Sequence, residues 1–337
     1  MRTACPTLDD VCGWNELARG IVANTRTNPP MASRVYAYLS VAIDEVLTEA
    51  PSDLGTVSTS ILAALLPGIE PHRPCERSAR AIVRRLIERM KSDRADAVWQ
   101  GTIPQGPGSW SGTNPLLPLW GEVEPWCLDR GSQFRAPLHA PFGSPAFDEA
   151  LAEVRRISDA RTPEQLRIAR FWADGSGTST PAGHWNAIAC DILKRTTRDA
   201  RRAAHVLRCL NIAMADAAIC CWDNKYAHWL LRPSQANHAI TTPVGLPNFP
   251  SFTSGHATFS GAAARVLGAL IPAAATEVEA MAQEAALSRL YGGIHYRFDN
   301  ETGLEGGRLV ADVALACCER SCMSCGSCDC CSCGGSC

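Results

Sequence analysis

The chain of 337 residues is 46% hydrophobic and 20% charged, which is ordinary for a globular protein and sufficient for one large core or two modest ones. Its formal net charge of −2 argues against general binding to nucleic acid. Its apolar runs are too short to span a bilayer, and the N-terminus carries Asp9 and Asp10 without the apolar centre of a signal peptide. The sequence therefore predicts no transmembrane segment and no signal peptide, and the compartment stays unknown.

Helical periodicity and Ala-rich composition predominate, so the sequence predicts an all-α protein. One helix start is clear, because Thr162 to Gln165 has the form of a capping box with Pro163 at the first helical position. The run 199–231 contains no Gly or Pro, which predicts one long helix ended by Pro233. The predicted helices span residues 14–24, 32–49, 57–66, 76–91, 145–158, 163–172, 184–196, 199–231, 257–270 and 280–290.

Residues 101–143 interrupt the helical pattern with Pro, Gly and Trp. Trp110, Trp120 and Trp126 lie in this segment, and tryptophan side chains favour packing on the body of a protein. The segment is therefore predicted to be a long ordered loop or lid, not a linker.

Lys225 and Arg232 introduce a group of cations in the C-terminal half. Their spacing of seven residues is two helical turns, so the sequence predicts that both project from one face of the long helix near its end. Two cations at that place suit a multiply charged anion. A solvated surface role is an equally good interpretation of this pair alone.

Ser254, Gly255 and His256 stand between the loop 243–253 and the helix predicted to follow. A Ser-Gly pair at a helix N-terminus offers a hydroxyl and free backbone N–H groups where the helix dipole favours an anion, and Gly255 allows close backbone approach. His256 beside them can transfer a proton near neutral pH. A plain helix cap explains Ser254 equally well.

Arg289, His295 and Asp299 form the third stretch. A Gly-Gly pair before His295 predicts a break in the helix, and the break lets Arg289 and His295 face one site although they are six residues apart. Asp299, four residues after His295, predicts a carboxylate that accepts from one imidazole nitrogen and fixes the tautomer. Three cations, a Gly-flanked hydroxyl and two histidines between residues 225 and 299 together predict a pocket for a tetrahedral oxyanion.

These three stretches resemble the signature motifs of the superfamily that unites vanadium-dependent haloperoxidases with type 2 phosphatidic acid phosphatases. Within it, the chain looks most similar to the vanadium chloroperoxidase branch and its bacterial relatives. The similarity includes Trp222 three residues before Lys225, Phe249-Pro250 before the Ser-Gly-His motif, and the string SRLYGGIHYRFD at residues 288–299. It extends upstream to about Phe171.

The resemblance implies a helical bundle of the haloperoxidase and acid phosphatase type, with vanadate as cofactor. His295 would be the single protein ligand to vanadium, with Asp299 behind it, and His256 would be the acid–base residue. Lys225 would polarise the peroxide. The residues that would hydrogen-bond the oxygens of vanadate are Lys225, Arg232, Ser254, Gly255 and Arg289.

The resemblance also implies the substrates, which are hydrogen peroxide, a halide that leaves as hypohalous acid, and a small organic acceptor. Trp222 and Phe249 occupy positions where apolar aromatics accompany chloride oxidation in the family, because a weakly polar wall desolvates the halide. Ordinary core packing explains both residues equally well. Asp174 would pair with Arg289, as an aspartate does with a pocket arginine in the chloroperoxidases. Thr253 departs from the family pattern, which commonly has proline there.

Two other functions stay open at this point. A soluble acid phosphatase would use His295 as a phosphohistidine nucleophile and His256 to protonate the leaving group, in the same pocket. In a third class of function, the pocket only binds phosphate and a Cys-rich tail mediates metal storage or assembly. The halide is not determined, and a homo-oligomer is compatible with the sequence.

The predicted organisation has three parts: N-terminal helices and the Pro/Gly/Trp-rich loop at 1–160, a vanadate- or phosphate-binding helical domain at 161–316, and a Cys-rich tail at 317–337. Nine of the 17 cysteines fall in this tail, among Ser and Gly and without aromatic residues. A segment of this composition cannot build a core. Three interpretations stay open: a disordered tail, disulfide links, or binding of a soft metal such as Zn or Cu(I).

Overall fold

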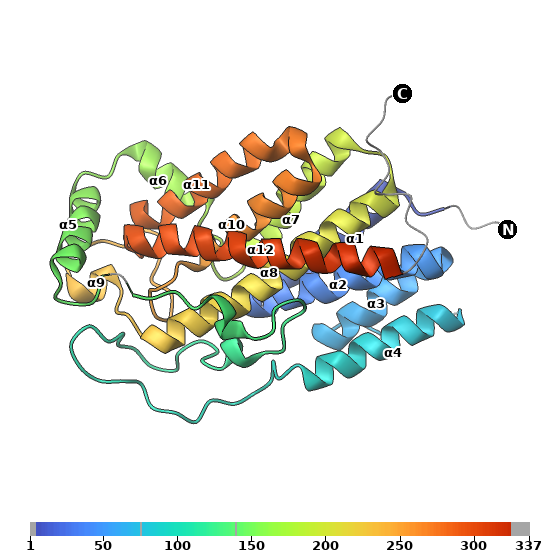
Figure 1. The fold of residues 1–337 in the computed structure, drawn as a ribbon, viewed down its shortest axis with the longest axis horizontal. Coiled ribbons are helices and arrows are strands. Elements are labelled where there is room, and N and C mark those ends of the chain that lie inside the picture. Colours follow the sequence, from blue (N-terminus) through green and yellow to red (C-terminus); the bar gives the residue numbers. More distant parts are fainter. Residues whose placement is uncertain (1–4, 75, 139, 325–337) are drawn as a thin grey trace.

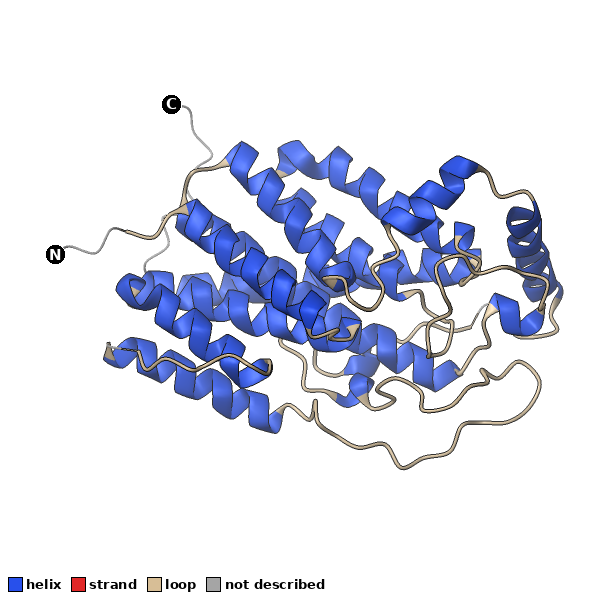
Figure 2. Ribbon diagram, turned by 180° about the vertical axis from the view of Figure 1, so that it is seen from behind, coloured by secondary structure: helices blue, strands red, loops and turns tan. Residues whose placement is uncertain are grey.

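The computed structural model describes residues 5–74, 76–138 and 140–324. Across these residues the fold is helical and contains no β-strand, and one isolated bridge joins Ser109 to Leu230 (Figure 1, Figure 2). The predicted all-α class is confirmed. The α-helices are α1 (Leu8–Asn24), α2 (Pro29–Glu49), α3 (Leu54–Leu65), α4 (Arg77–Ser92), α5 (Pro145–Asp159), α6 (Pro163–Phe171), α7 (Thr180–Thr196), α8 (Ala200–His228), α9 (Pro233–Ala236), α10 (Gly255–Leu270), α11 (Ala275–Tyr291) and α12 (Arg297–Ser324).

The predicted helices correspond to ten of these, and most ends differ by only a few residues. The capping box at α6 is present, since Thr162 Oγ1 accepts from Gln165 N–H at 3.2 Å and Gln165 Oε1 accepts from Thr162 N–H at 3.0 Å. The long helix α12 was not predicted, because three glycines weaken its intrinsic helical propensity. Packing against α10 supplies what its local sequence lacks.

α8 ends earlier than predicted, and this changes the relation between Lys225 and Arg232. Its last residue is His228, and Trp229 closes it in a left-handed conformation with φ 50°. Arg232 is the N-cap of α9, so Pro233 opens that helix and does not end α8. The prediction that Lys225 and Arg232 share one helix face is therefore wrong. A turn between two helices, and not one helix, brings them into the same site.

α8 lies at the centre of the fold, and α2, α10 and α12 pack around it (Figure 1). It is the one helix of the described chain that is long and apolar enough to cross a membrane. The expectation that no segment reaches that length is wrong for α8, but 89% of its apolar window is buried inside the protein, as in a core helix.

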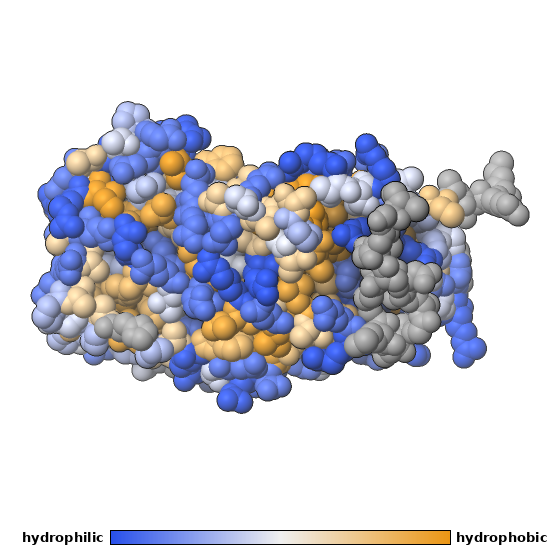
Figure 3. Space-filling model, turned by 45° about the horizontal axis from the view of Figure 1, so that its top comes forward, coloured by the Kyte–Doolittle hydropathy of each residue, from blue (hydrophilic) through white to orange (hydrophobic). Residues whose placement is uncertain are grey.

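Polar side chains dominate the face in Figure 3, with apolar patches between them.

α10 and α12 approach each other closely because glycines lie at their crossing. A Cβ on Gly261 would collide with the carbonyl oxygen of Leu304, and one on Gly307 would collide with that of Thr258. At the end of this contact, the backbone N–H of Ser254 donates to the carbonyl of Asp299 at 3.0 Å. The close packing therefore joins the start of α10 to the start of α12, where two of the predicted motifs lie.

The Pro/Gly/Trp-rich segment is an ordered loop that packs on the body, as predicted. Trp110 and Trp120 are buried, and the ring of Trp126 lies 4.4 Å from the Arg89 guanidinium. The buried carboxylate of Asp216 on α8 fixes the loop by accepting three backbone N–H bonds of 2.7, 2.8 and 3.1 Å. The donors are Trp126, Cys127 and Leu128.

One apolar core runs through both halves of the chain, from Leu8 in α1 to Cys318 in α12. The division at residue 160 stays a prediction. α12 continues to Ser324, so the first part of the predicted tail is helical, while 325–337 and the chemistry predicted for their cysteines lie outside the described residues. In the part that is described, no group of three His, Cys, Asp or Glu side chains could hold a metal ion.

Candidate active site

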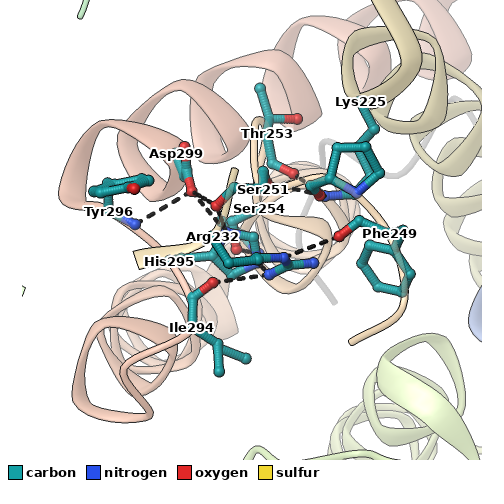
Figure 4. Close-up of polar contacts among 12 residues, drawn as sticks. Lys225, Arg232, Phe249, Ser251, Thr253, Ser254, Ile294, His295, Tyr296 and Asp299 are labelled. Carbon is teal, nitrogen blue, oxygen red and sulfur yellow. Dashed lines mark hydrogen bonds and ion pairs between the residues drawn. The ribbon is translucent and has the colours of Figure 1, made fainter. Parts of the chain in front are cut away.

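Lys225 lies in the last two turns of α8 and is completely buried. Its Nζ donates to the carbonyl oxygens of Pro250 at 3.1 Å, Ser251 at 3.1 Å and Thr253 at 2.5 Å (Figure 4). Burial lowers the pKa of Lys225 to about 8. The three carbonyls fix the ammonium group and make Lys225 the anchor of the 250–253 loop.

Arg232 is also completely buried, at the N-cap of α9. Its Nε donates to the Phe249 carbonyl at 3.0 Å, and its Nη1 donates to the Ile294 carbonyl at 2.8 Å and lies 3.0 Å from His295 Nε2 (Figure 4). Burial lowers the pKa of Arg232 to about 10. Its Nη2 has no hydrogen-bond partner within the described structure.

His295 and Asp299 form a buried pair at the start of α12. His295 Nδ1 lies 2.8 Å from Asp299 Oδ2, and the same oxygen accepts from Ser251 Oγ at 2.5 Å and from the Tyr296 N–H at 3.2 Å. The sequence analysis missed Ser251, which stands three residues before Ser254 and has no feature that marks it out. Burial raises the pKa of Asp299 to about 6, against the hydrogen bond from Ser251 and the charges of Lys225 and Arg232. Asp299 is therefore ionised at neutral pH and fixes the proton of His295 on Nδ1.

His295 is held as a neutral imidazole. Burial is the main cause that keeps its pKa well below the ordinary value of 6.5, and four neighbouring groups act in the same direction. These four groups are Arg232, Lys225, His256 and Arg289. The structure thus gathers residues from all three predicted motifs around one imidazole.

Ser254 and Gly255 begin α10 as predicted. Ser254 is the N-cap, and its Oγ accepts from the Ala257 N–H at 3.4 Å, so the plain capping role is present. Gly255 lines the small inner cavity beside His256, and a Cβ there would meet only the Trp222 ring at 3.7 Å. Both the capping and the anion-binding interpretations of this helix start fit the geometry.

His256 follows them, lines the same cavity and lies near the carboxylate of Asp174. Asp174 was predicted to pair with Arg289. Its carboxylate instead lies 3.2 Å from His184 Nδ1 and 3.9 Å from His256 Nε2. The reason lies in the turn after α6: it carries Asp174, with φ 43°, toward α7, where Trp172 stacks on the His184 ring at 4.5 Å. The predicted ion pair is therefore replaced by a contact with two histidines.

Arg289 meets its neighbours through neutral groups. Its Nε donates to Ser288 Oγ at 2.8 Å and its Nη2 donates to the Ala169 carbonyl at 2.8 Å. Burial lowers the pKa of Arg289 to about 10, while the charge of Asp174 acts in the opposite direction. Asp174 is therefore a through-space partner of Arg289 and not a bonded one.

Trp222 and Phe249 form an aromatic wall beside the cations, with ring centroids 5.0 Å apart. Lys225 Nζ lies 4.9 Å and Arg232 Cζ 5.0 Å from the centroid of Phe249. An inner cavity of about 40 Å³ is bounded by this wall, Gly255 and both predicted catalytic histidines, His256 and His295.

An outer cleft of about 360 Å³ shares Phe249 and His256 with the inner cavity, and Arg289 and Asp174 line it as well. The sequence analysis missed the contribution of the N-terminal half to this cleft. Residues Arg26 to Pro29, in the turn from α1 to α2, and Leu116 in the long loop form part of its lining. Their sequence carries no motif, and only the packing of the two halves brings them to the site.

These residues fit a tetrahedral oxyanion such as vanadate or phosphate. Arg232 Nη2 and His256 Nε2 are buried polar atoms without hydrogen-bond partners among the described residues. Leaving a buried donor such as Arg232 Nη2 unpaired is costly, and an anionic oxygen is the acceptor that it lacks. The neutral His295 adds a nitrogen of the form that binds metals.

Comparisons with known proteins agree with this geometry. Residues 269–323 match the family model of the VCPO second helical-bundle domain. The crystal structure of the first bacterial vanadium-dependent iodoperoxidase is similar, with 24% identity and a TM-score of 0.81, over 94% of this chain and 97% of its own. Apo and holo crystal structures of a bacterial vanadium-dependent chloroperoxidase are similar at 13% identity, with TM-scores of 0.69 and 0.68, over 88% of this chain and 94% of theirs.

Among curated proteins, none matches the chain. The matched segment 269–323 contains α11 and most of α12, and therefore Arg289, His295 and Asp299. The predicted resemblance is confirmed for the fold. The chain thus has the fold of the bacterial vanadium-dependent haloperoxidases, and its residues 269–323 match the second helical-bundle domain of the VCPO family model.

Proposed function

We propose that the protein is a vanadium-dependent haloperoxidase, which oxidises a halide with hydrogen peroxide and passes the halogen to a small organic acceptor. The observation that carries this proposal is the environment of His295. A buried neutral imidazole is oriented by Asp299, and its other nitrogen faces the buried cation Arg232. A neutral imidazole with a carboxylate behind it is the arrangement that binds metals, and buried cations suit the oxygens of an anion.

In this proposal, His295 would hold vanadate through Nε2, and Arg232, whose Nη1 lies 3.0 Å from that nitrogen, would donate to the oxygens of the anion. When bound, vanadate supplies an electrophilic centre at which hydrogen peroxide can oxidise a halide by two electrons. Lys225, held by three carbonyls, keeps a positive charge at a fixed place beside that centre. The remaining donors to the anion are Ser254, Gly255 and Arg289.

His256 is assigned to proton transfer. The overall conversion of hydrogen peroxide, halide and one proton to hypohalous acid and water requires a group that takes up and returns protons. Burial keeps the pKa of His256 well below its ordinary value, so the ring is neutral and can accept a proton. Asp174, 3.9 Å from Nε2, stabilises the imidazolium that then forms.

Trp222 and Phe249 are assigned to the halide. Their apolar faces lie beside the cations, so an anion drawn there loses part of its hydration, which makes it easier to oxidise. The similar structures include an iodoperoxidase and a chloroperoxidase. We propose that the protein oxidises iodide, which is more easily oxidised than bromide or chloride. Oxidation of chloride would be the stricter test of the role assigned to Trp222 and Phe249.

The test is peroxide-dependent halogenation by the purified protein with and without orthovanadate. Monochlorodimedone reports bromide and chloride oxidation, and triiodide formation reports iodide oxidation. Activity that requires both vanadate and peroxide is expected, with a loss of at least ~100-fold in His295→Ala. His238→Ala is the matched control, because His238 is exposed and bonds only to a local carbonyl at 3.1 Å. Vanadate-independent activity, or equal activity of His295→Ala, would refute the proposal.

An acid phosphatase is the second candidate, and the His295–Asp299 contact favours it as well. An imidazole oriented by a carboxylate is a competent nucleophile toward a phosphomonoester, with His256 placed to protonate the leaving group. The two candidates respond oppositely to vanadate, which activates the haloperoxidase and inhibits the phosphatase.

A further inference from the structure

Two neighbouring cysteines near the C-terminal end of α12 each face another cysteine from a distant part of the chain. The Cys318 thiol hydrogen-bonds to that of Cys209 on α8, and the Cys317 thiol hydrogen-bonds to that of Cys127 in the long loop. Cys209 and Cys318 are buried, while Cys127 and Cys317 are half-buried. Successive residues of one helix thus contact two different partners.

Cys209 and Cys127 are held in place by helix packing and by backbone hydrogen bonds. Cys209 lies in the buried face of α8, which packs along α12 (Figure 1). Cys127 is held against α8, because Asp216 of that helix accepts the backbone N–H of Cys127 at 2.8 Å and those of both neighbouring residues. The long loop, α8 and α12 therefore meet at this group of four cysteines, well apart from the three motifs of the active site.

The chemistry around these thiols favours one reactive sulfur. The hydrogen bond from Cys209 lowers the pKa of Cys318, while the same contact raises that of Cys209. His205 Nε2 lies 3.6 Å from Cys209 Sγ, and burial lowers the pKa of His205, so this imidazole is neutral and can accept a proton. A thiolate at Cys318 would find its partner sulfur already in contact.

We propose that these four cysteines form two disulfides, Cys127–Cys317 and Cys209–Cys318, when the protein meets hydrogen peroxide, and that the pair of disulfides clamps α12 to α8 and to the long loop. For each disulfide, a thiolate attacks a peroxide oxygen, the O–O bond breaks, and a sulfenic acid and water form. The partner thiol then displaces the sulfenic oxygen as a second water. Two thiols and one hydrogen peroxide thus give one disulfide and two waters.

Two other cysteines of α8 provide an internal comparison. Cys220 and Cys221 are as deeply buried as Cys209, but their thiols donate to backbone carbonyls, those of Phe134 at 3.7 Å and Thr253 at 3.6 Å. In the described structure neither of these thiols makes a hydrogen bond to a second sulfur. Cys220 and Cys221 are therefore expected to stay reduced under the conditions that oxidise the clamp.

The test uses the full chain, reduced with dithiothreitol, desalted and treated with a small excess of hydrogen peroxide without halide or vanadate. Remaining thiols are alkylated, and the protein is digested with trypsin and Asp-N without reduction. These proteases separate peptides 96–128, 209–215 and 312–320, which isolate Cys127, Cys209 and the vicinal pair from Cys220, Cys221 and the tail. Because vanadate is omitted, the result does not depend on the proposed haloperoxidase activity.

The expected product is a single species of these three peptides that separates on reduction, together with alkylated Cys220 and Cys221. Alkylated thiols in peptide 312–320, a bond between Cys317 and Cys318, or a link from this peptide to the tail segment 321–337 would each overturn the proposal.

Thermal unfolding gives a second measurement. Each disulfide would close a loop of more than about 100 residues, so peroxide treatment is expected to raise Tm by about 5 °C or more, reversibly with dithiothreitol. Cys209→Ser should reduce this rise, and Cys220→Ser should keep it. If Cys209→Ser does not fold, Cys127→Ser, which removes a half-buried thiol, takes its place. The thiols of Cys12 and Cys190 also hydrogen-bond to each other, so the decisive variants carry Cys12→Ser as well. In that background, a rise in Tm that persists after Cys127→Ser and Cys209→Ser would contradict the clamp.

Discussion

His295 Nδ1 and Asp299 Oδ2 lie 2.8 Å apart, and this contact couples the break after α11 to the first turn of α12. Ser251, from the loop before α10, donates to the same oxygen at 2.5 Å. One carboxylate therefore receives the imidazole that would hold the cofactor and a hydroxyl from the loop that surrounds Lys225.

Replacing Asp299 should disorient His295 without removing it. In Asp299→Ala, vanadate-dependent kcat is expected to fall ~10²-fold or more, because the tautomer and orientation of His295 are no longer fixed. In the wild type, activity should fall as pH drops through about 6, where Asp299 becomes protonated. Asp312→Ala is the control, since Asp312 lies on the same helix as Asp299 but forms an exposed ion pair with Arg265 of α10. Equal losses in the two variants would count against an orienting role.

Lys225 should make anion binding depend on pH. Its pKa of about 8 lies below the ordinary 10.5, so the anion-free protein gains stability as pH rises from about 8 to about 10, where the unfolded chain binds more protons. A bound anion favours the charged form, so the affinity for inorganic phosphate should fall up to ~10-fold per pH unit above about 8.

Isothermal titration calorimetry with phosphate, repeated at intervals of about one pH unit between about pH 7 and 9.5, measures this dependence. Lys225→Gln should bind ~10- to 100-fold more weakly at pH 7 and lose most of the slope. A wild-type slope that persists unchanged in Lys225→Gln would assign the titration to another group.

His184 is predicted to position Asp174 against His256. His184→Phe keeps a ring beside Trp172 but removes the nitrogen that contacts the carboxylate, and it should lower kcat about tenfold with KM for peroxide little changed. His184→Gln retains a polar group and should recover most of kcat. The measurement is steady-state kinetics with vanadate-saturated protein. Equal kcat values for the two variants would show that the contact does not matter to the reaction.

The crossing of α10 and α12 should tolerate no side chain at Gly307. A Cβ there collides with the Thr258 carbonyl and the Ala262 nitrogen, so Gly307→Ala should lower the free energy of unfolding in urea by ~2–4 kcal/mol. Gly306, the preceding residue, has open space around its Cα, and Gly306→Ala should raise the same quantity by ~0.5–1 kcal/mol. Two changes of the same sign would mean that the helices do not approach as closely as described.

Local sequence was sufficient for most helices and for the start of α10, because caps, periodicity and the absence of Gly and Pro are properties of neighbouring residues. It was not sufficient to predict α12, because glycine has a low helical propensity. In the structure the glycines of α12 allow it to pack closely on α10. Local sequence also did not predict the path of the chain from Lys225 to Arg232. A single residue in the left-handed conformation, Trp229, turns the chain there, and the pattern of residue types does not indicate that turn.

The same limit applies to partners within the site. The three motifs were predicted to converge, and their members do surround His295. Which group Asp174 contacts depends on how the turn after α6 packs on α7, so the sequence indicated Arg289 where the structure has His184 and His256. Ser251 and Arg26 reach the site only through tertiary packing, and neither carries a motif.

The most direct test of the proposed haloperoxidase function is one orthovanadate titration of the metal-free protein followed by two assays, halide oxidation with peroxide and hydrolysis of p-nitrophenyl phosphate. Halide oxidation is expected to rise from background and saturate with vanadate in the wild type, and to stay at background in His295→Ala. Phosphomonoester hydrolysis that is present without vanadate and disappears along the same titration, with no halide oxidation, would contradict the haloperoxidase proposal and identify the site as that of a phosphatase.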